Sequence, residues 1–232
     1  MKIFLLIGQS NMAGRGELTD VPRISDPLCF MLRNGRFQPM AEPICFDRPI
    51  YGGTRSGVGP GASFAHAAAQ FFGEKIGLVP CADGGTSLAD WAAGGLLYDN
   101  AVMQTRLAMR SGTLAGILWH QGEAECGTEE RAFSYAARFG AMMEQMKRDI
   151  GADVPLVLGE LGSYLRDFRG GTGAPYWQTV NEQLHLYAAS HPKTAIASAE
   201  GLLPKEDNLH FSAAAQREFG LRYFAAYRTL LA

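Results

Sequence analysis

Short apolar runs alternate along the chain with longer segments of helical periodicity. Five runs have the length and composition of buried strands: Ile3–Ile7, Lys75–Pro80, Leu114–Trp119, Val154–Leu158 and Thr194–Ala197. Between the third and fourth runs, apolar residues recur at spacings of three and four, which predicts one helix over Glu129–Ile150. Similar patterns predict helices over Ala62–Phe72, Asn100–Arg110, Tyr176–Ser190 and Ser212–Leu231, the last with Ser212 as its N-cap.

This alternation of strand and helix is typical of an α/β fold with a parallel sheet that helices cover on both faces. No repeat or linker divides the chain, so we expect a single domain over residues 1–232. Leu28–Met40 is expected to form a hairpin that turns at Asn34-Gly35. Ligands bind at the carboxyl ends of strands in such sheets, so the chemistry is expected directly after the apolar runs.

Composition and charge exclude several classes of protein. The 232 residues include 21 basic and 23 acidic side chains, and this balance predicts no binding of nucleic acid or of an anionic membrane. An apolar content of 47% excludes a disordered chain. The four cysteines are scattered, which fits neither a zinc ribbon nor a disulfide scaffold and favours free, buried thiols.

The N-terminal run is too short for a targeting or membrane segment. Ile3–Ile7 falls below the roughly 7–15 apolar residues of a signal peptide, and no run reaches the roughly 20 of a membrane span. We therefore expect a buried first strand and a cytoplasmic protein, or a secreted one if a leader has been removed.

Polar and glycine residues follow the first two runs. Ser10, in Gly8-Gln9-Ser10-Asn11-Met12, lies where a strand passes into a loop or helix. A serine there can expose its hydroxyl beside backbone N–H groups that favour negative charge, although a simple polar N-cap is the alternative. Gly84 and Gly85 follow the second run and can present an N–H group to an oxyanion or form a plain turn.

The third run ends in Trp119-His120-Gln121-Gly122-Glu123. The Gln121 amide can donate to an oxyanion, and Glu123 can orient a histidine or accept from a substrate hydroxyl. His120 can act as a base, but a structural role is favoured for it at this strand end. Glu125 is expected to be solvated.

Asp207 and His210 lie three residues apart just before the last predicted helix. On a tight loop, the carboxylate can bond one ring nitrogen and leave the other free to act as a base. An N-capping Asp with a surface His is the alternative. Taken together, the residues after the strands supply a nucleophile, oxyanion donors, a base and an orienting acid for acyl transfer.

Five blocks in this order resemble the SGNH/GDSL hydrolase superfamily, and more narrowly its sialate O-acetylesterase-like and family 6 carbohydrate esterase branch, which includes acetylxylan esterases. The blocks are Gly8-Gln9-Ser10-Asn11-Met12, Gly59-Pro60-Gly61-Ala62-Ser63-Phe64, Gly84-Gly85-Thr86-Ser87, Trp119-His120-Gln121-Gly122-Glu123 and Asp207-Asn208-Leu209-His210-Phe211. The resemblance implies a three-layer α/β/α fold with a five-stranded parallel sheet. It also implies serine ester hydrolysis without a metal or other cofactor.

The resemblance also implies roles for single residues. Ser10 matches the nucleophile and His210 the general base, while either Asp207 or Glu123 matches the acid. The oxyanion hole would comprise the Ser10 N–H, the N–H of Gly85 in preference to Gly84, and the Gln121 side chain. Ala124-Glu125 departs from the Ser-Asp more usual in this branch, which leaves substrate contacts near that loop open.

The hypothesis is therefore an esterase that hydrolyses O-acetyl groups on a small sugar or an oligosaccharide, such as acetylated xylan or sialic acid. Candidate substrate contacts are Gln9, Asn11, Arg55 and Trp91, with packing or surface roles as the alternative for Arg55 and Trp91. Two other functions stay open: a lipid or thioester hydrolase on the same fold, and a non-catalytic carbohydrate-binding protein. The sequence does not indicate the oligomeric state.

Overall fold

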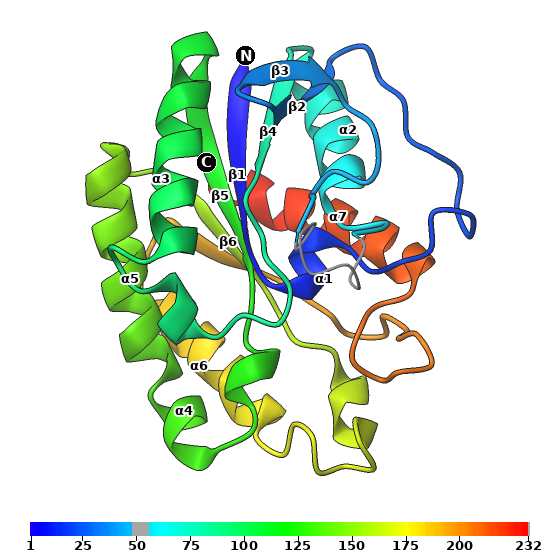
Figure 1. The fold of residues 1–232 in the computed structure, drawn as a ribbon, viewed down its shortest axis with the longest axis vertical. Helices are drawn as coiled ribbons and strands as arrows, with labels where there is room; N and C mark the ends of the chain where they lie inside the picture. The colour runs from blue at the N-terminus through cyan, green and yellow to red at the C-terminus, as the bar shows by residue number, and fades with distance from the viewer. Residues whose placement is uncertain (48–55, 232) are drawn as a thin grey trace.

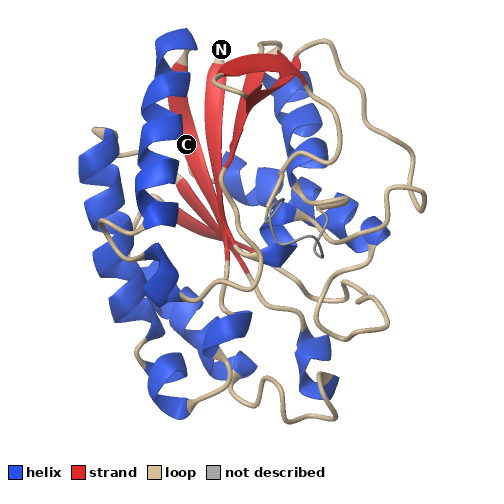
Figure 2. Ribbon diagram, in the orientation of Figure 1, coloured by secondary structure: helices blue, strands red, loops and turns tan. Residues whose placement is uncertain are grey.

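The computed structural model describes residues 1–47 and 56–231. Its centre is a seven-stranded sheet in the order β3-β2-β4-β1-β5-β6-β7 (Figures 1 and 2). All neighbouring strands run parallel except β2 and β3. The α/β class with a mainly parallel sheet is therefore confirmed. The strands are β1 (Lys2–Gly8), β2 (Cys29–Arg33), β3 (Arg36–Pro39), β4 (Ile76–Pro80), β5 (Thr113–His120), β6 (Leu156–Gly159) and β7 (Thr194–Ala197).

The sheet has seven strands where five were predicted, because the hairpin at Asn34-Gly35 joins it. These two residues have φ angles of 51° and 76°, the positive values that a two-residue hairpin turn requires. β2 pairs in parallel with β4, with Cys29 beside Ile76, and β3 forms the outer edge. The other five strands lie on the five predicted runs.

Helices cover both faces of the sheet and give three layers (Figure 1). α2 and α7 pack together on one face, whereas α3, α5 and α6 form the layer on the other. The helices are α1 (Ser10–Ala13), α2 (Gly61–Phe72), α3 (Leu96–Ala108), α4 (Glu129–Phe133), α5 (Tyr135–Ile150), α6 (Trp177–Ser190) and α7 (Ala213–Arg228), with short 3₁₀ segments at η2 (Leu88–Trp91), η3 (Met109–Ser111), η4 (Glu123–Glu125) and η5 (Ser163–Asp167).

The single helix predicted over Glu129–Ile150 is two helices, which meet at Ser134. The Ser134 hydroxyl donates to the Glu130 carbonyl at 2.7 Å, and the Ser134 backbone leaves helical geometry with ψ near 1°. A serine that bonds back to the preceding turn bends or interrupts a helix. The predicted N-cap of the last helix is confirmed, since the Ser212 hydroxyl accepts the N–H of Ala215.

β1, the middle strand, lies inside the hydrophobic core. Ile3–Ile7 have no exposed surface, as expected for a strand covered on both faces. Phe4 packs edge-on against Phe64 of α2 at 4.8 Å and against Tyr227 of α7 at 5.1 Å between ring centroids. The four cysteines are free and buried, as predicted. The strand that leads to Ser10 is therefore held firmly on both faces.

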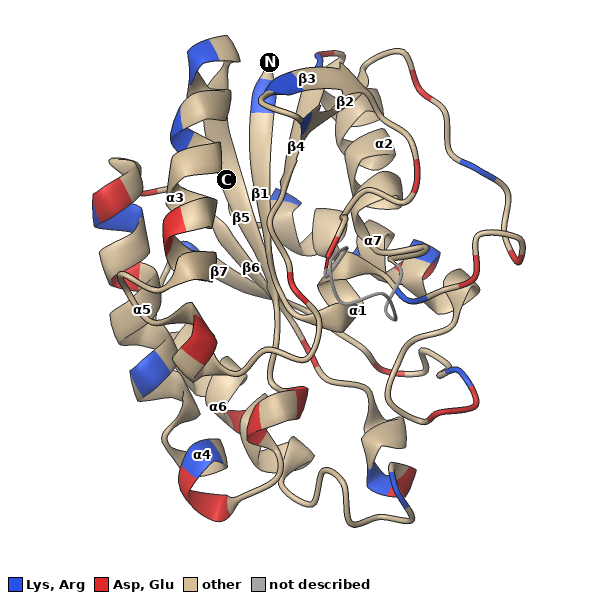
Figure 3. Cartoon of the chain, viewed as in Figure 1, with Lys and Arg blue, Asp and Glu red and all other residues tan. Residues whose placement is uncertain are grey.

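The surface carries charges of both signs. Figure 3 shows acidic and basic residues mixed over the helices and loops, with neither sign gathered into one large patch in this view. None of the helices in the described ranges is long and apolar enough to cross a membrane.

Candidate active site

Backbone hydrogen bonds join the carboxyl ends of β1, β4 and β5 next to Ser10. Gly8 ends β1 opposite His120, the last residue of β5. The Gly8 carbonyl accepts the N–H of Asp83 at 3.0 Å, and the N–H of Gln9 donates to the His120 carbonyl at 2.8 Å. Gly8 has a φ angle of +126°, and a Cβ there would lie 2.0 Å from the His120 carbonyl oxygen. Only glycine allows the strands to approach so closely.

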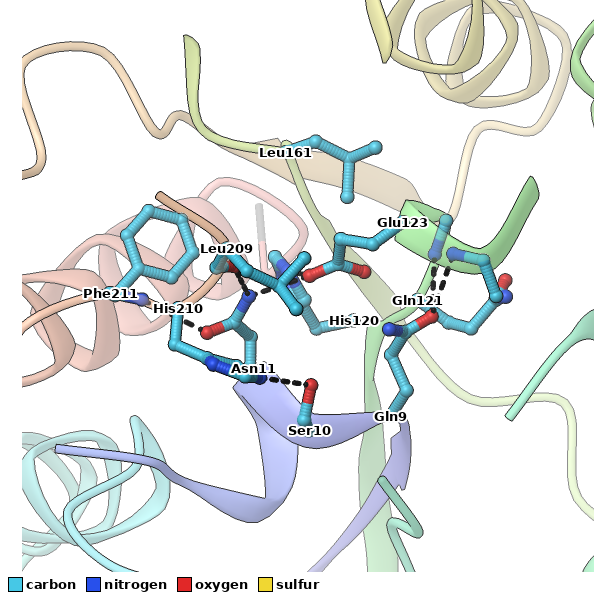
Figure 4. Close-up of polar contacts among 12 residues, drawn as sticks. Gln9, Ser10, Asn11, His120, Gln121, Glu123, Leu161, Leu209, His210 and Phe211 are labelled. Atoms are coloured by element: carbon cyan, nitrogen blue, oxygen red, sulfur yellow. Dashed lines mark hydrogen bonds and ion pairs between the residues drawn. The ribbon is translucent and has the colours of Figure 1, made fainter. Parts of the chain in front are cut away.

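Ser10 begins α1, and its hydroxyl meets an imidazole that lies 200 residues later in the chain. His210 lies in the loop between β7 and α7. Its Nε2 is 3.0 Å from Ser10 Oγ (Figure 4), and its Nδ1 is 2.7 Å from Asp207 Oδ2. Ser10 is about 5% exposed, so the hydroxyl sits at the base of the loops. The order of hydroxyl, imidazole and carboxylate is that of a nucleophile, its base and an orienting acid.

The Asp207 carboxylate is positioned by its own loop. Oδ1 accepts the backbone N–H groups of Leu209 and His210, both at 2.9 Å, which leaves Oδ2 for the ring. Burial alone would raise the pKa of Asp207, but the bonds from the His210 ring and from both N–H groups lower it below its ordinary value. An ionised Asp207 accepts Nδ1–H of His210, which leaves Nε2 free to accept a proton from Ser10.

Glu123, the other candidate acid, bonds to Asn11 and His120 rather than to His210. Its Oε1 accepts the side-chain N–H of Asn11 at 2.6 Å and lies 3.2 Å from Nε2 of His120. The opposite ring nitrogen of His120 faces the hydroxyl of Tyr223 at 3.3 Å. His120 is almost fully buried among these groups, in line with the structural role favoured for it. Of the two acids that the sequence left open, Asp207 is the one that contacts His210.

Gln121 is buried beneath the loop that follows β4. The side chain has no exposed surface, its Nε2 donates to the Thr86 carbonyl at 3.2 Å, and its Oε1 accepts the Tyr135 hydroxyl at 3.1 Å. Both ends of the amide are therefore engaged with protein groups, and the amide supports the loop that carries Gly84 and Gly85.

The amide of Gln9 lies against the loop that follows β5. Its Oε1 accepts the backbone N–H groups of Gly122 and Ala124, both at 3.4 Å. Only the oxygen of an amide can face two N–H donors, so the NH₂ group must point the other way. Figure 4 shows this nitrogen turned toward the side of the site where Ser10 lies.

The two glycines after β4 differ in what their N–H groups do. The N–H of Gly84 donates to Asp47 Oδ2 at 2.9 Å, and this carboxylate is also paired with the buried guanidinium of Arg15. The N–H of Gly85 makes no hydrogen bond with any residue that the structure describes, and Gly85 is exposed. Of the two glycines, Gly85 is thus the one whose N–H has no partner among the described residues.

Two of the remaining candidate substrate contacts, Asn11 and Trp91, have buried side chains. Asn11 is buried, and both atoms of its amide bond to protein groups. Trp91 has no exposed surface, donates to the Thr86 hydroxyl at 3.1 Å and packs edge-on against Trp119, which is the packing role. Arg55 lies outside the described residues.

The expectation that Glu125 is solvated is wrong. The side chain is about 1% exposed, pairs with Arg138 of α5 and accepts the N–H of Leu88 at 2.8 Å. The short η4 turn directs it inward, where the guanidinium offsets the cost of burying its charge. The sequence shows no signal for this, because Arg138 lies 13 residues away in α5, beyond the intervening helix α4.

The arrangement can support attack on an acyl carbon, because a base contacts the hydroxyl and the loop after β4 carries an N–H, that of Gly85, with no partner among the described residues. Among residues 1–47 and 56–231, no three His, Cys, Asp or Glu side chains are grouped to hold a metal ion.

A family model described as carbohydrate esterase, sialic acid-specific acetylesterase matches residues 1–229. The chain belongs to this carbohydrate esterase family. The resemblance of the five sequence blocks is therefore confirmed.

One relative resembles the chain in both sequence and fold. The chain is 32% identical over 247 residues to the probable carbohydrate esterase At4g34215 of Arabidopsis thaliana, covering 97% of this chain and 90% of the relative. The crystal structure of that Arabidopsis protein matches with a TM-score of 0.87 at 30% identity, over 98% of each chain.

Two more distant structures share the fold. A carbohydrate acetylesterase from Xanthomonas citri matches with a TM-score of 0.67 at 19% identity, over 99% of this chain and 56% of the other. A lipase/acylhydrolase from Enterococcus faecalis matches with a TM-score of 0.57 at 12% identity, over 97% of this chain and 94% of the other.

Replacing Gly8 by alanine should destabilise this protein and disrupt its site, because the new Cβ would clash with the His120 carbonyl in a backbone conformation that alanine avoids. We expect a loss of at least about 3 kcal/mol in unfolding free energy, measured by urea denaturation. Gly73→Ala is the control, since Gly73 also has a positive φ but nothing lies within 4 Å of its Cβ position. Gly73→Ala should cost only about 1 kcal/mol, and equal losses for both variants would contradict the argument.

Proposed function

We propose that this protein is a serine esterase that removes acetyl groups from the hydroxyls of a carbohydrate. One observation carries the proposal: Nε2 of His210 lies 3.0 Å from Ser10 Oγ while Nδ1 lies 2.7 Å from the Asp207 carboxylate. Membership of the carbohydrate esterase family supports the substrate class.

In the proposed reaction, His210 takes the Ser10 proton as Oγ attacks the acetyl carbonyl carbon. The carbonyl oxygen becomes a tetrahedral oxyanion, and Asp207 stabilises the imidazolium that forms. When the intermediate collapses, the bond to the sugar oxygen breaks and His210 protonates that oxygen. Water then attacks the acetyl-enzyme with His210 again as base, which releases acetate and restores the Ser10 hydroxyl.

The proposed oxyanion donors are the backbone N–H groups of Ser10 and Gly85 and the side-chain amide of Gln9. Gly85 is exposed and its N–H bonds to no described residue, and the Gln9 NH₂ group faces the Ser10 side of the site. Gln9 takes the place assigned to Gln121 from sequence, because Gln121 has no exposed surface.

Acetate release from a panel of acetylated xylan, acetylated sialic acid and simple acetylated sugars tests the proposal. We expect turnover on at least one acetylated sugar, and Ser10→Ala should lower kcat by about 10⁴–10⁶-fold, as for triads that act as a unit. A series of 4-nitrophenyl esters of increasing chain length is run in parallel. Activity that peaks on long chains would favour a lipid or thioester hydrolase, and binding without turnover would favour a carbohydrate-binding protein.

Asp207→Asn should lower kcat by up to about 10⁴-fold with little change in KM, because an amide at this position favours the wrong tautomer of His210. Labelling of Ser10 by a fluorophosphonate should slow in the same variant. Asp153→Asn, which alters an exposed carboxylate paired with Lys193, serves as the control and should leave both rates unchanged. Wild-type kcat in Asp207→Asn would remove this residue from the proposed triad.

A pair of glutamine-to-glutamate variants tests the oxyanion donors. Gln9→Glu keeps an acceptor for the N–H groups of Gly122 and Ala124 but replaces the NH₂ donor by an oxygen, so kcat should fall by roughly 10²–10³-fold. Gln121→Glu loses its bond to the Thr86 carbonyl and should mainly lower Tm. The reverse pattern, measured by kinetics and thermal unfolding, would return the role to Gln121.

A further inference from the structure

The amide of Asn11 connects the helix that carries Ser10 to the loop that carries His210. Its Nδ2 donates to the Leu209 carbonyl at 3.1 Å, and its Oδ1 accepts the N–H of Phe211 at 3.1 Å (Figure 4). These two peptide groups lie on either side of His210. The nucleophile and its base are thus held in register by the residue that follows the nucleophile.

This connection works in only one orientation of the amide. An asparagine side chain has nearly the same shape when its oxygen and nitrogen are exchanged, so its partners decide the orientation. A carbonyl can only accept and an N–H can only donate, so an inverted Asn11 would face Leu209 with oxygen and Phe211 with nitrogen. Both hydrogen bonds beside His210 would then be lost.

Two side chains favour this orientation: Gln216 donates to Asn11 Oδ1 at 3.4 Å, and the NH₂ group of Asn11 faces the carboxylate of Glu123. Glu123 Oε1 accepts the Asn11 NH₂ group at 2.6 Å, the shortest bond of this amide, and an ionised carboxylate can only accept. Burial would raise the pKa of Glu123, but the facing His120 and the bonds from His120 and Asn11 lower it below its usual value. The carboxylate is therefore ionised where it meets Asn11.

We propose that Glu123 is a positioning residue that acts through Asn11: its carboxylate fixes the orientation of the Asn11 amide, and this amide fixes the peptide groups on either side of His210. The proposal rests on the proposed esterase function for its kinetic consequences. It assigns Glu123 a role separate from that of the triad acid, since the Glu123 carboxylate bonds to Asn11 and His120 and not to His210.

A double-mutant cycle tests the link. Asn11→Asp places one carboxylate against another and against the Leu209 carbonyl, so kcat should fall by about 10²–10³-fold. Glu123→Gln leaves a weaker, neutral partner, and kcat should fall about 10-fold. In the double variant, the new Gln amide can donate to the new Asp carboxylate, so kcat should be at least about 10-fold higher than in Asn11→Asp alone. A double variant no better than Asn11→Asp would overturn the proposal.

Hydrogen exchange of the Phe211 N–H, followed by NMR, gives a readout that does not depend on activity. We expect faster exchange in Glu123→Gln than in the wild type, because the acceptor of this N–H is less well fixed. Asp26→Asn is the matched control, since Asp26 is also a buried carboxylate bonded by a histidine and an amide, His66 and Gln70, in another part of the fold. It should change neither Phe211 exchange nor kcat.

Different results would overturn the proposed esterase function and the proposed role of Glu123. If the wild type released no acetate from any ester, the proposed function would be wrong, but faster Phe211 exchange in Glu123→Gln would still support the link. If Glu123→Gln lowered kcat with unchanged Phe211 exchange, Glu123 would act directly in the reaction and the proposal would be overturned. Unchanged kcat and unchanged exchange would overturn it as well. If Asn11→Asp failed to fold, Glu123→Gln and the exchange measurement would still decide.

Discussion

The hydrogen bonds of the Asn11 amide hold together two segments that the sheet alone would not bring into register. β1 delivers Ser10 to the carboxyl edge, but His210 comes from an irregular loop beyond the last strand. No ladder of strand pairing fixes that loop. The bonds from Asn11 to Leu209 and Phe211 tie that loop to the helix of Ser10, as does the bond from Lys205 Nζ to the Arg15 carbonyl, and Nε2 of His210 lies 3.0 Å from Ser10 Oγ.

Buried carboxylates hold the other loops at this edge in the same manner. Asp47 accepts the N–H of Gly84, Glu125 accepts the N–H of Leu88, and each is neutralised by a guanidinium, of Arg15 and Arg138 respectively. A buried charge is costly unless it is paired and hydrogen-bonded, and these are both. The chain has only 19% charged residues, yet several of them are placed where backbone must be fixed without secondary structure.

The sequence predicted the parts of this molecule that depend on local pattern. Apolar runs located five strands, and the Asp-x-x-His spacing anticipated the contact between Asp207 and His210. The sequence did not predict contacts between distant segments. These are the pairing of the hairpin with β4, the ion pair of buried Glu125 with Arg138, and the different hydrogen-bond partners of Gln9 and Gln121. The type of a residue determines which hydrogen bonds its side chain can make. Which partner it contacts depends on how the loops pack at the edge of the sheet.

The distance along the chain between Ser10 and His210 has a consequence for biosynthesis. A domain generally folds as a unit, and the ribosome makes Ser10 long before the segment that carries the base. The hydroxyl and its imidazole are separated by 200 residues. The nascent chain therefore carries an unactivated serine until the loop before α7 has been translated and has docked, and any ester-cleaving power would arise as one of the last events of folding.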